Sequence, residues 1–261
     1  MPLDMRQTEY TLIAGSVYRP GQLDVSLRDQ RPAAPVELTY KTVAKALDRK
    51  GLRYKDEATL MSLMAVAGLG DALGTPEQRE RTAVIVSSNF NNIDTVVQVA
   101  RQIEAEHVHA TSAMALPNAS SNAVAATIAI VFQLRGTNLM LCNGDRSGED
   151  AIGLAQQLLA AGRADRVVVV GVEVDNADIR TLFPDVAYRF HGAAAVLLGD
   201  QADAPRVRPV MDAAFSATDR AATERVCGEA SGAEGILRLL LAAECDSPVL
   251  MGAHTWCVVA P

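Results

Sequence analysis

Apolar runs that alternate with helical segments constrain this sequence most strongly. Residues Thr82–Ser88 read TAVIVSS, and residues Arg166–Val172 read RVVVVGV. Continuous runs of this kind are typical of strands that are buried on both faces of a sheet. Between them, residues Asn92–Glu106 carry apolar side chains at helical spacing. The sequence therefore predicts an α/β layered fold.

The rest of the chain continues this alternation. We expect further strands at residues 8–17, 138–142, 192–198, 207–211 and 255–260, and further helices at residues 57–73, 119–134, 147–161 and 232–243. Gly136 is expected to stop the second of these helices, and Gly162 lies where the third needs a C-terminal cap. Residues 22–56 are polar and predict no regular element.

The composition excludes several classes of function. The 261 residues include 24 Lys and Arg against 31 Asp and Glu, a net charge of −7 without a basic run, so we expect no nucleic-acid partner. No apolar stretch is long enough to span a membrane, and the first residues lack the order of a signal peptide. The four cysteines have no metal-ligand spacing, which predicts reduced, mostly buried thiols of a cytoplasmic protein. We expect no metal and no cofactor.

Three stretches, in this order, resemble the β-ketoacyl synthases of the thiolase superfamily. Residues 112–139 (SAMALPNASSNAVAATIAIVFQLRGTNL) resemble the proline-asparagine helix and the approach to the nucleophile strand. Residues 142–173 (CNGDRSGEDAIGLAQQLLAAGRADRVVVVGVE) resemble the nucleophile turn, its helix and a strand that ends in Gly-x-Glu. Residues 190–200 (FHGAAAVLLGD) are similar to the strand G-E-G-A-A-x-L-V-L, and residues 227–242 are more weakly similar to the segment G-H-x-x-G-A-A-G.

The resemblance implies a thiolase-like fold with layers in the order α-β-α-β-α. The family is normally much longer, and the missing length falls between Asp200 and Cys227. We therefore interpret residues 1–261 as one domain, with an intact ketosynthase-like half at residues 1–200 and a reduced second half at residues 201–261. Family members are usually dimers that join acyl units by decarboxylative condensation, using a Cys nucleophile at a helix start and two His side chains.

The positions that carry this chemistry are replaced here. Aligning Ser147-Gly148 with the family's Ser-Gly places Asp145 at the nucleophile position, where a carboxylate is a poor acceptor for a thioester-bound acyl chain. We interpret Asp145 as a cap of the following helix, and Ser147 with Asp150 as a variant of the capping box. Glu229 stands at one His position, where its charge would oppose an oxyanion, and the other His falls in the missing stretch.

Cys142 precedes the nucleophile position by three residues. We interpret it as a small buried apolar side chain. A shifted register, which would make Cys142 the nucleophile, is the alternative.

These observations leave three hypotheses. The first is a non-catalytic, chain-length-factor-like subunit that forms a heterodimer with an active β-ketoacyl synthase homologue in type II polyketide, aryl-polyene or fatty-acid-like biosynthesis and shapes its acyl tunnel. An acyl carrier protein would then bind mainly to the partner, because its acidic surface is repelled by a chain of charge −7. The second is a residual malonyl-carrier decarboxylase or acyltransferase that uses Asp145 or Glu229, and the third is a structural thiolase-like homodimer that binds an acyl ligand.

The first hypothesis assigns an interface and a tunnel wall. The short, apolar strand at residues 138–142 needs covering if it lies at a sheet edge, and the resemblance implies that it pairs across a two-fold axis. The interface candidates are Asn138, Leu139, Met140, Leu141 and Cys142. The tunnel-wall candidates are Met114, Leu116 and Phe132, for which ordinary core packing is the alternative.

Overall fold

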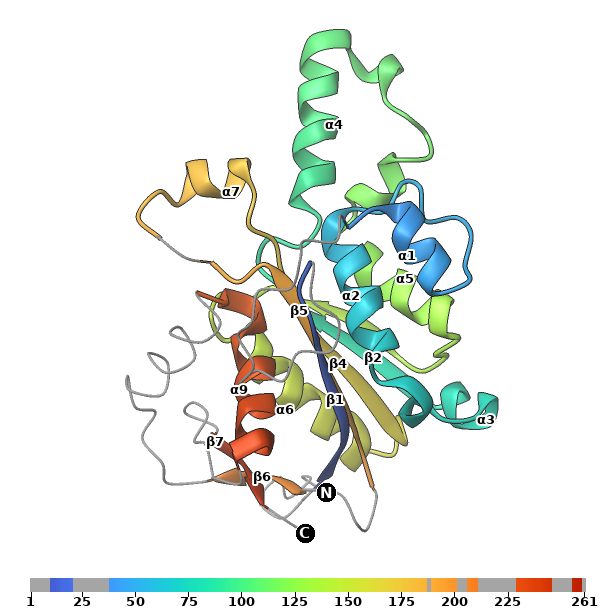
Figure 1. The fold of residues 1–261 in the computed structure, drawn as a ribbon, viewed down its shortest axis with the longest axis vertical. Helices are drawn as coiled ribbons and strands as arrows, with labels where there is room; N and C mark the ends of the chain where they lie inside the picture. The colour runs from blue at the N-terminus through green and yellow to red at the C-terminus, as the bar shows by residue number, and fades with distance from the viewer. Residues whose placement is uncertain are drawn as a thin grey trace.

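The fold is built on one seven-stranded mixed sheet, seen in a computed structural model of the chain (Figure 1). The structure describes residues 10–20, 38–186, 189–200, 206–210, 229–245 and 255–259. The strands are β1 (Tyr10–Tyr18), β2 (Thr82–Ser87), β3 (Asn138–Leu141), β4 (Arg166–Glu173), β5 (Gly192–Gly199), β6 (Arg206–Val210) and β7 (Thr255–Val259). Their order across the sheet is β3-β2-β4-β5-β1-β6-β7. All seven predicted strands are therefore present.

The sheet changes from parallel to antiparallel pairing at β4. β2 runs parallel to both β3 and β4, with Val84 opposite Asn138 on one side and Val168 on the other. β5 pairs antiparallel with β4 and with β1, and β6 and β7 extend the sheet antiparallel beyond β1. The carboxyl ends of β1, β2 and β4 consequently lie at the same end of the sheet, where the segments that follow them meet.

Both faces of the sheet are buried by helices, which explains the continuous apolar runs in β2 and β4. One face packs against α2 (Glu57–Ala67) and α5 (Ala123–Phe132), and the other packs against α6 (Ser147–Ala160) and α9 (Glu234–Cys245). In β4, alternate valines enter the two cores: Val167 and Val169 face α6, whereas Val168 and Val170 face α2. The thiolase-like layered fold is confirmed, and the described residues form three of its layers, in the order α-β-α.

Glycines allow α6 and α9 to pack closely. A Cβ atom on Gly148 would lie 2.8 Å from the backbone nitrogen of Gly235, and one on Gly235 would lie 2.5 Å from the nitrogen of Glu149. The two helices therefore meet backbone to backbone near their first turns. Beside this contact, Arg238 is buried and forms ion pairs with Glu234 and Glu149.

The remaining helices lie around this framework. They are α1 (Tyr40–Ala46), α3 (Pro76–Glu80), α4 (Ile93–Glu106) and α7 (Ala177–Leu182), with 3-10 turns at η1 (Gly70–Leu73), η2 (Val108–Ala110), η3 (Leu116–Ala119) and η4 (Ser231–Ala233). α4 projects from one end of the fold, and the segment after it returns to α5 (Figure 1). No residue of α4 is buried, although its apolar side chains lie on one side of the helix.

Several predicted boundaries change in the structure. The helix predicted at residues 57–73 ends at Ala67, because Gly68 caps it and Gly70 takes a positive φ of 53°. The helix predicted at residues 119–134 begins at Ala123, after the 3-10 turn at η3. Gly136 does not stop this helix, which ends with Gln133 in the left-handed conformation. Gly136 instead lies against the backbone of Thr82, where a Cβ atom would come within 2.7 Å.

Helices α1, α3 and α7 were not predicted, and α1 falls in the stretch that gave no clear pattern. All three are short and begin at side-chain caps, Thr39, Thr75 and Asn176. Gly162 has the positive φ of 62° that a cap after α6 requires, as predicted.

Candidate functional site

The predicted nucleophile turn connects β3 to α6. Asp145 is exposed in this turn and does not cap α6, because the N-cap residue is Arg146, whose side chain makes no capping hydrogen bond. The predicted capping box is also wrong. The Ser147 hydroxyl accepts from the Asn143 backbone N–H at 2.6 Å and donates to the Gly144 carbonyl at 2.8 Å, and the Asp150 carboxylate accepts from the Asn143 side-chain amide at 2.6 Å. Both side chains thus hold the turn itself.

Cys142 is an exposed free thiol directly after β3. Its sulfur lies 3.8 Å from the backbone oxygen of Asn89 and 3.9 Å from the side-chain oxygen. The prediction of a buried thiol is therefore wrong for this residue. The reason is topological: β3 is an edge strand, so among the described residues no strand lies on the outer side of the residue that follows it.

Asn89 joins this turn to the start of α9. Its side-chain nitrogen donates to the Ser231 hydroxyl, and its side-chain oxygen lies 3.2 Å from the Ser147 hydroxyl. Asn89 is the second residue after β2, whereas Ser147 begins α6 and Ser231 begins η4. The sequence analysis missed Asn89, although a polar side chain shortly after a fully buried strand was a signal for it.

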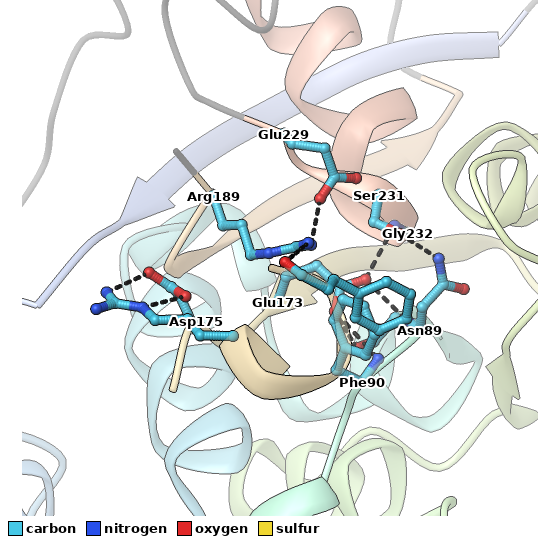
Figure 2. A network of polar contacts seen from close by, with 11 residues as sticks. Asn89, Phe90, Glu173, Asp175, Arg189, Glu229, Ser231 and Gly232 are labelled. Atoms are coloured by element: carbon cyan, nitrogen blue, oxygen red, sulfur yellow. Dashed lines mark hydrogen bonds and ion pairs between the residues drawn. The ribbon is translucent and has the colours of Figure 1, made fainter. Parts of the chain in front are cut away.

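Glu173, the last residue of β4, is the centre of the site (Figure 2). One carboxylate oxygen accepts from the backbone N–H groups of Asn89 at 2.7 Å and Gly232 at 2.9 Å. The other accepts from the Ser88 hydroxyl and the Phe90 N–H, both at 3.1 Å. Burial raises the pKa of this carboxyl to about 7, although these four hydrogen bonds oppose the rise. Glu173 thus connects the segment after β2 to the beginning of η4.

Gly232 is required by this arrangement. A Cβ atom there would lie 2.7 Å from the Glu173 carboxylate and 2.8 Å from the Cα of Ser88. The motif that ends in Glu173 was recognised in the sequence, but its role as a buried acceptor for two loops depends on contacts that only the fold brings together.

Glu229, which the sequence resemblance aligns with a family His, forms an ion pair. Its carboxylate oxygen lies 2.8 Å from Nη1 of Arg189, and its backbone carbonyl accepts from the Phe190 N–H at 2.8 Å (Figure 2). Arg189 is 6% exposed, and its guanidinium lies over the rings of Phe90 and Phe183. The Glu229 carboxylate is therefore held by a buried positive charge.

β3 lies at the edge of the sheet, as expected. Asn138 is exposed, and Leu139, Met140 and Leu141 are half-buried. Met140 packs against the core beneath α2, and Leu141 against the core beneath α6. In the part of the chain that the structure describes, the outer side of β3 has no neighbouring strand.

Large apolar side chains are exposed on the segment before α5 and on α5 itself. Met114 is 64% exposed, Leu116 49% and Ile130 76%. Core packing within the chain is therefore the wrong alternative for Met114 and Leu116, whereas Phe132 is half-buried and does pack against the core. Ile130 also borders a shallow groove with Asn138 at the start of β3. We call Ile130 and β3 the edge patch.

No helix among the described residues is long and apolar enough to cross a membrane. The described ranges also contain no group of three or more His, Cys, Asp or Glu side chains placed to hold a metal ion.

The sequence has recognisable relatives. The family model described as "Beta-ketoacyl synthase, N-terminal domain" matches residues 37–183. The 3-oxoacyl-[acyl-carrier-protein] synthase 2 of Rhizobium meliloti (strain 1021) is 28% identical over 110 residues, which is 42% of this chain and 26% of that protein. The match thus spans about a quarter of the length of that curated relative.

Solved structures share the fold at low sequence identity. A chain of the ishigamide ketosynthase/chain length factor superposes with a TM-score of 0.61 at 18% identity, covering 83% of both chains. A chain of the complex between the ketosynthase ApeO and its chain length factor ApeC from Xenorhabdus doucetiae superposes with a TM-score of 0.59 at 14% identity. This second match covers 96% of the present chain and 100% of the other, so the fold also occurs at about this chain length.

Proposed function

From the premise that this chain belongs to the β-ketoacyl synthase family, we propose that it is a non-catalytic, chain-length-factor-like subunit. It would form a heterodimer with an active β-ketoacyl synthase and contribute to the wall of that enzyme's acyl tunnel. The pathways in question are type II polyketide, aryl-polyene or fatty-acid-like biosynthesis. The observation that carries the proposal is the pair Asp145 and Glu229, at the positions that the sequence resemblance assigns to the nucleophile and to one His.

The two replacements leave little capacity for condensation. A thiolate at a helix start is a good acyl acceptor because the helix dipole lowers its pKa, whereas a carboxylate in the same turn forms at best a reactive mixed anhydride. An oxyanion at the Glu229 position would need a hydrogen-bond donor, whereas the side chain there is a carboxylate. This carboxylate already pairs with Arg189. Both facts favour a subunit that does not perform the reaction alone.

Pairing is supported by the edge patch. A short sheet edge next to the exposed side chain of Ile130 is a poor surface to leave in water, and a second ketosynthase-like chain could cover both features at once. Two of the solved structures with this fold are described as a ketosynthase with a chain length factor. Met114 and Leu116 are exposed, so they are free to line a cavity that is shared with a partner.

The domain organisation of the whole chain is part of the same proposal. We propose a single domain over residues 1–261, with a ketosynthase-like part at residues 1–200 and a reduced part at residues 201–261. It is supported by β6 and β7, which join the sheet of the first part, and by α9, which packs on α6. An acyl carrier protein would act indirectly, through the partner, and we propose that the complex works in the cytoplasm.

Co-expression tests the pairing. The chain is expressed with each full-length β-ketoacyl synthase of the source organism in turn, and complexes are measured by native mass spectrometry. We expect a one-to-one heterodimer and a change in the length of the acyl products. Ile130→Glu should weaken the complex about tenfold or more, because it would place an unpaired charge in the contact. Leu182→Glu is the matched control, since Leu182 is 62% exposed on α7, outside the edge patch.

Two results would contradict the proposal. One is a stoichiometric covalent acyl adduct on the isolated protein, which would show that it retains a nucleophile. The other is a chain that binds none of the synthases and alters none of their products. A homodimer with a co-purifying acyl ligand would support the structural hypothesis instead, and CO2 release that Asp145→Ala abolishes would support the residual decarboxylase.

A further inference from the structure

A cavity of about 600 Å³ lies where β1 and β4 end and β5 begins, among the middle strands of the sheet. Its polar wall contains three arginines, Arg19, Arg180 and Arg189, together with His191. Among the described lining residues Asp175 is the one carboxylate. The cavity therefore contains more positive than negative charge.

Two of the arginines have internal partners. Arg180 forms a bidentate ion pair with Asp175, with nitrogen–oxygen distances of 3.0 Å and 2.7 Å. Arg189 pairs with Glu229 and donates to the Phe183 carbonyl at 3.2 Å. Figure 2 shows these two arginine–carboxylate pairs, with Asp175 and Arg189 labelled. Their charges are balanced inside the protein.

His191 also has partners inside the protein. Its Nδ1 lies 3.0 Å from the Asp175 backbone nitrogen, which donates to it, and its Nε2 lies 3.3 Å from the Glu57 carboxylate. Both ring nitrogens are therefore in contact with groups of the chain itself.

Arg19 is the arginine whose charge is not balanced. Its guanidinium lies 5.2 Å from the ring centre of Phe190, and its Nη2 atom is buried without a hydrogen-bond partner. Within the described ranges no carboxylate pairs with it. A buried guanidinium donor without an acceptor is unfavourable, and an anion in the cavity would satisfy it.

We propose that this cavity binds an organic oxyanion, in which a phosphate or carboxylate group is attached to an apolar part. Arg19 would be the principal charge partner, because the planar guanidinium matches the oxygens of both groups. Phe183, Pro184 and Val186 line the same cavity and supply an apolar wall for the rest of the ligand. The proposal concerns this chain alone and does not depend on pairing with a synthase.

Binding is measured on the full chain by isothermal titration calorimetry and thermal shift. The probes are inorganic phosphate, phenyl phosphate and hexanoate, each at an ionic strength matched with KCl. We expect saturable binding of at least one probe, with phenyl phosphate tighter than inorganic phosphate if the apolar wall contributes. The comparison of phenyl phosphate with hexanoate distinguishes the two kinds of oxyanion.

Three variants make the assignment specific. Arg19→Gln should weaken binding about tenfold, because a charge-assisted hydrogen bond is replaced by a neutral one. Asp175→Asn should tighten binding about threefold, because it removes the negative charge and releases Arg180. Arg101→Gln, an exposed arginine of α4 outside the cavity, should bind like the wild type.

The proposal is overturned if no probe binds beyond the KCl control. It is also overturned if Arg19→Gln, shown to be folded by circular dichroism, binds as tightly as the wild type. Should Arg19→Gln fail to fold, Asp175→Asn decides, because unchanged or weaker binding there contradicts a charge-selected site.

Discussion

The buried carboxyl of Glu173 makes the stability of this protein depend on pH in a way that one substitution should remove. The folded chain raises the pKa of Glu173 from 4.5 to about 7 because the side chain is fully buried. Between pH 4.5 and pH 7 the Glu173 carboxyl is therefore protonated in the folded state and ionised in the unfolded state. The contribution of protonated Glu173 to the free energy of unfolding is fully present below pH 4.5 and is lost as the pH rises through 7.

The size of the effect follows from the same two values. A rise in pKa from 4.5 to about 7 corresponds to roughly 3 kcal/mol in the free energy of unfolding, most of which is lost between pH 5 and pH 8. Glu173→Gln cannot ionise, so it should lack this dependence. Its amide nitrogen would face donors such as the Phe90 N–H, so we also expect a loss of about 1–3 kcal/mol at low pH, where the wild type keeps its proton.

The assay is urea unfolding followed by circular dichroism at pH 5, 6, 7 and 8. The stability difference between wild type and Glu173→Gln should shrink by roughly 2–3 kcal/mol across this range. Glu80→Gln is the control, because its carboxylate is 54% exposed, and its difference from wild type should not change with pH. Parallel pH profiles for wild type and Glu173→Gln would refute the argument.

Three further substitutions test separate features. Gly148→Ala should lower stability by about 2 kcal/mol and reduce Tm, because its Cβ would press on the backbone of Gly235; an unchanged Tm would mean that α6 and α9 separate easily. Asp94→Asn should raise the unfolding free energy at pH 7 relative to pH 5, because burial and the nearby Glu57, Asp56 and Asp178 raise the pKa of Asp94 to about 6; equal gains at both pH values would contradict this. Cys142→Ser should remove one fast-reacting equivalent in a thiol titration of the native protein, and an unchanged count would mean that the thiol is covered.

Helix α4 shows how burial and periodicity can differ. The apolar side of α4 was readable from the sequence, and such a pattern usually predicts a helix that packs on the core. In the structure α4 projects from the fold without a buried residue. Periodicity reports that a face is apolar, but it does not report whether that face is covered within the same chain.

Some features of the candidate site could be predicted from the sequence, and others could not. Asp145 and Glu229 could be found by alignment because motifs fix their place in the chain order. The Glu173 network and the unbalanced charge of Arg19 could not, because they join residues separated by more than fifty positions. The exposure of Cys142 also depended on the strand order, which no local pattern determines.

Local patterns in the amino-acid order thus predicted the strands, the main helices and the positions of Asp145 and Glu229 in the motifs, since each depends on near neighbours or on a motif. Tertiary structure decided which strand forms the edge, which apolar side chains remain exposed and which charges find partners. The physical reason is that burial and electrostatic pairing depend on distances between segments that are far apart in the chain, and only the folded packing sets those distances.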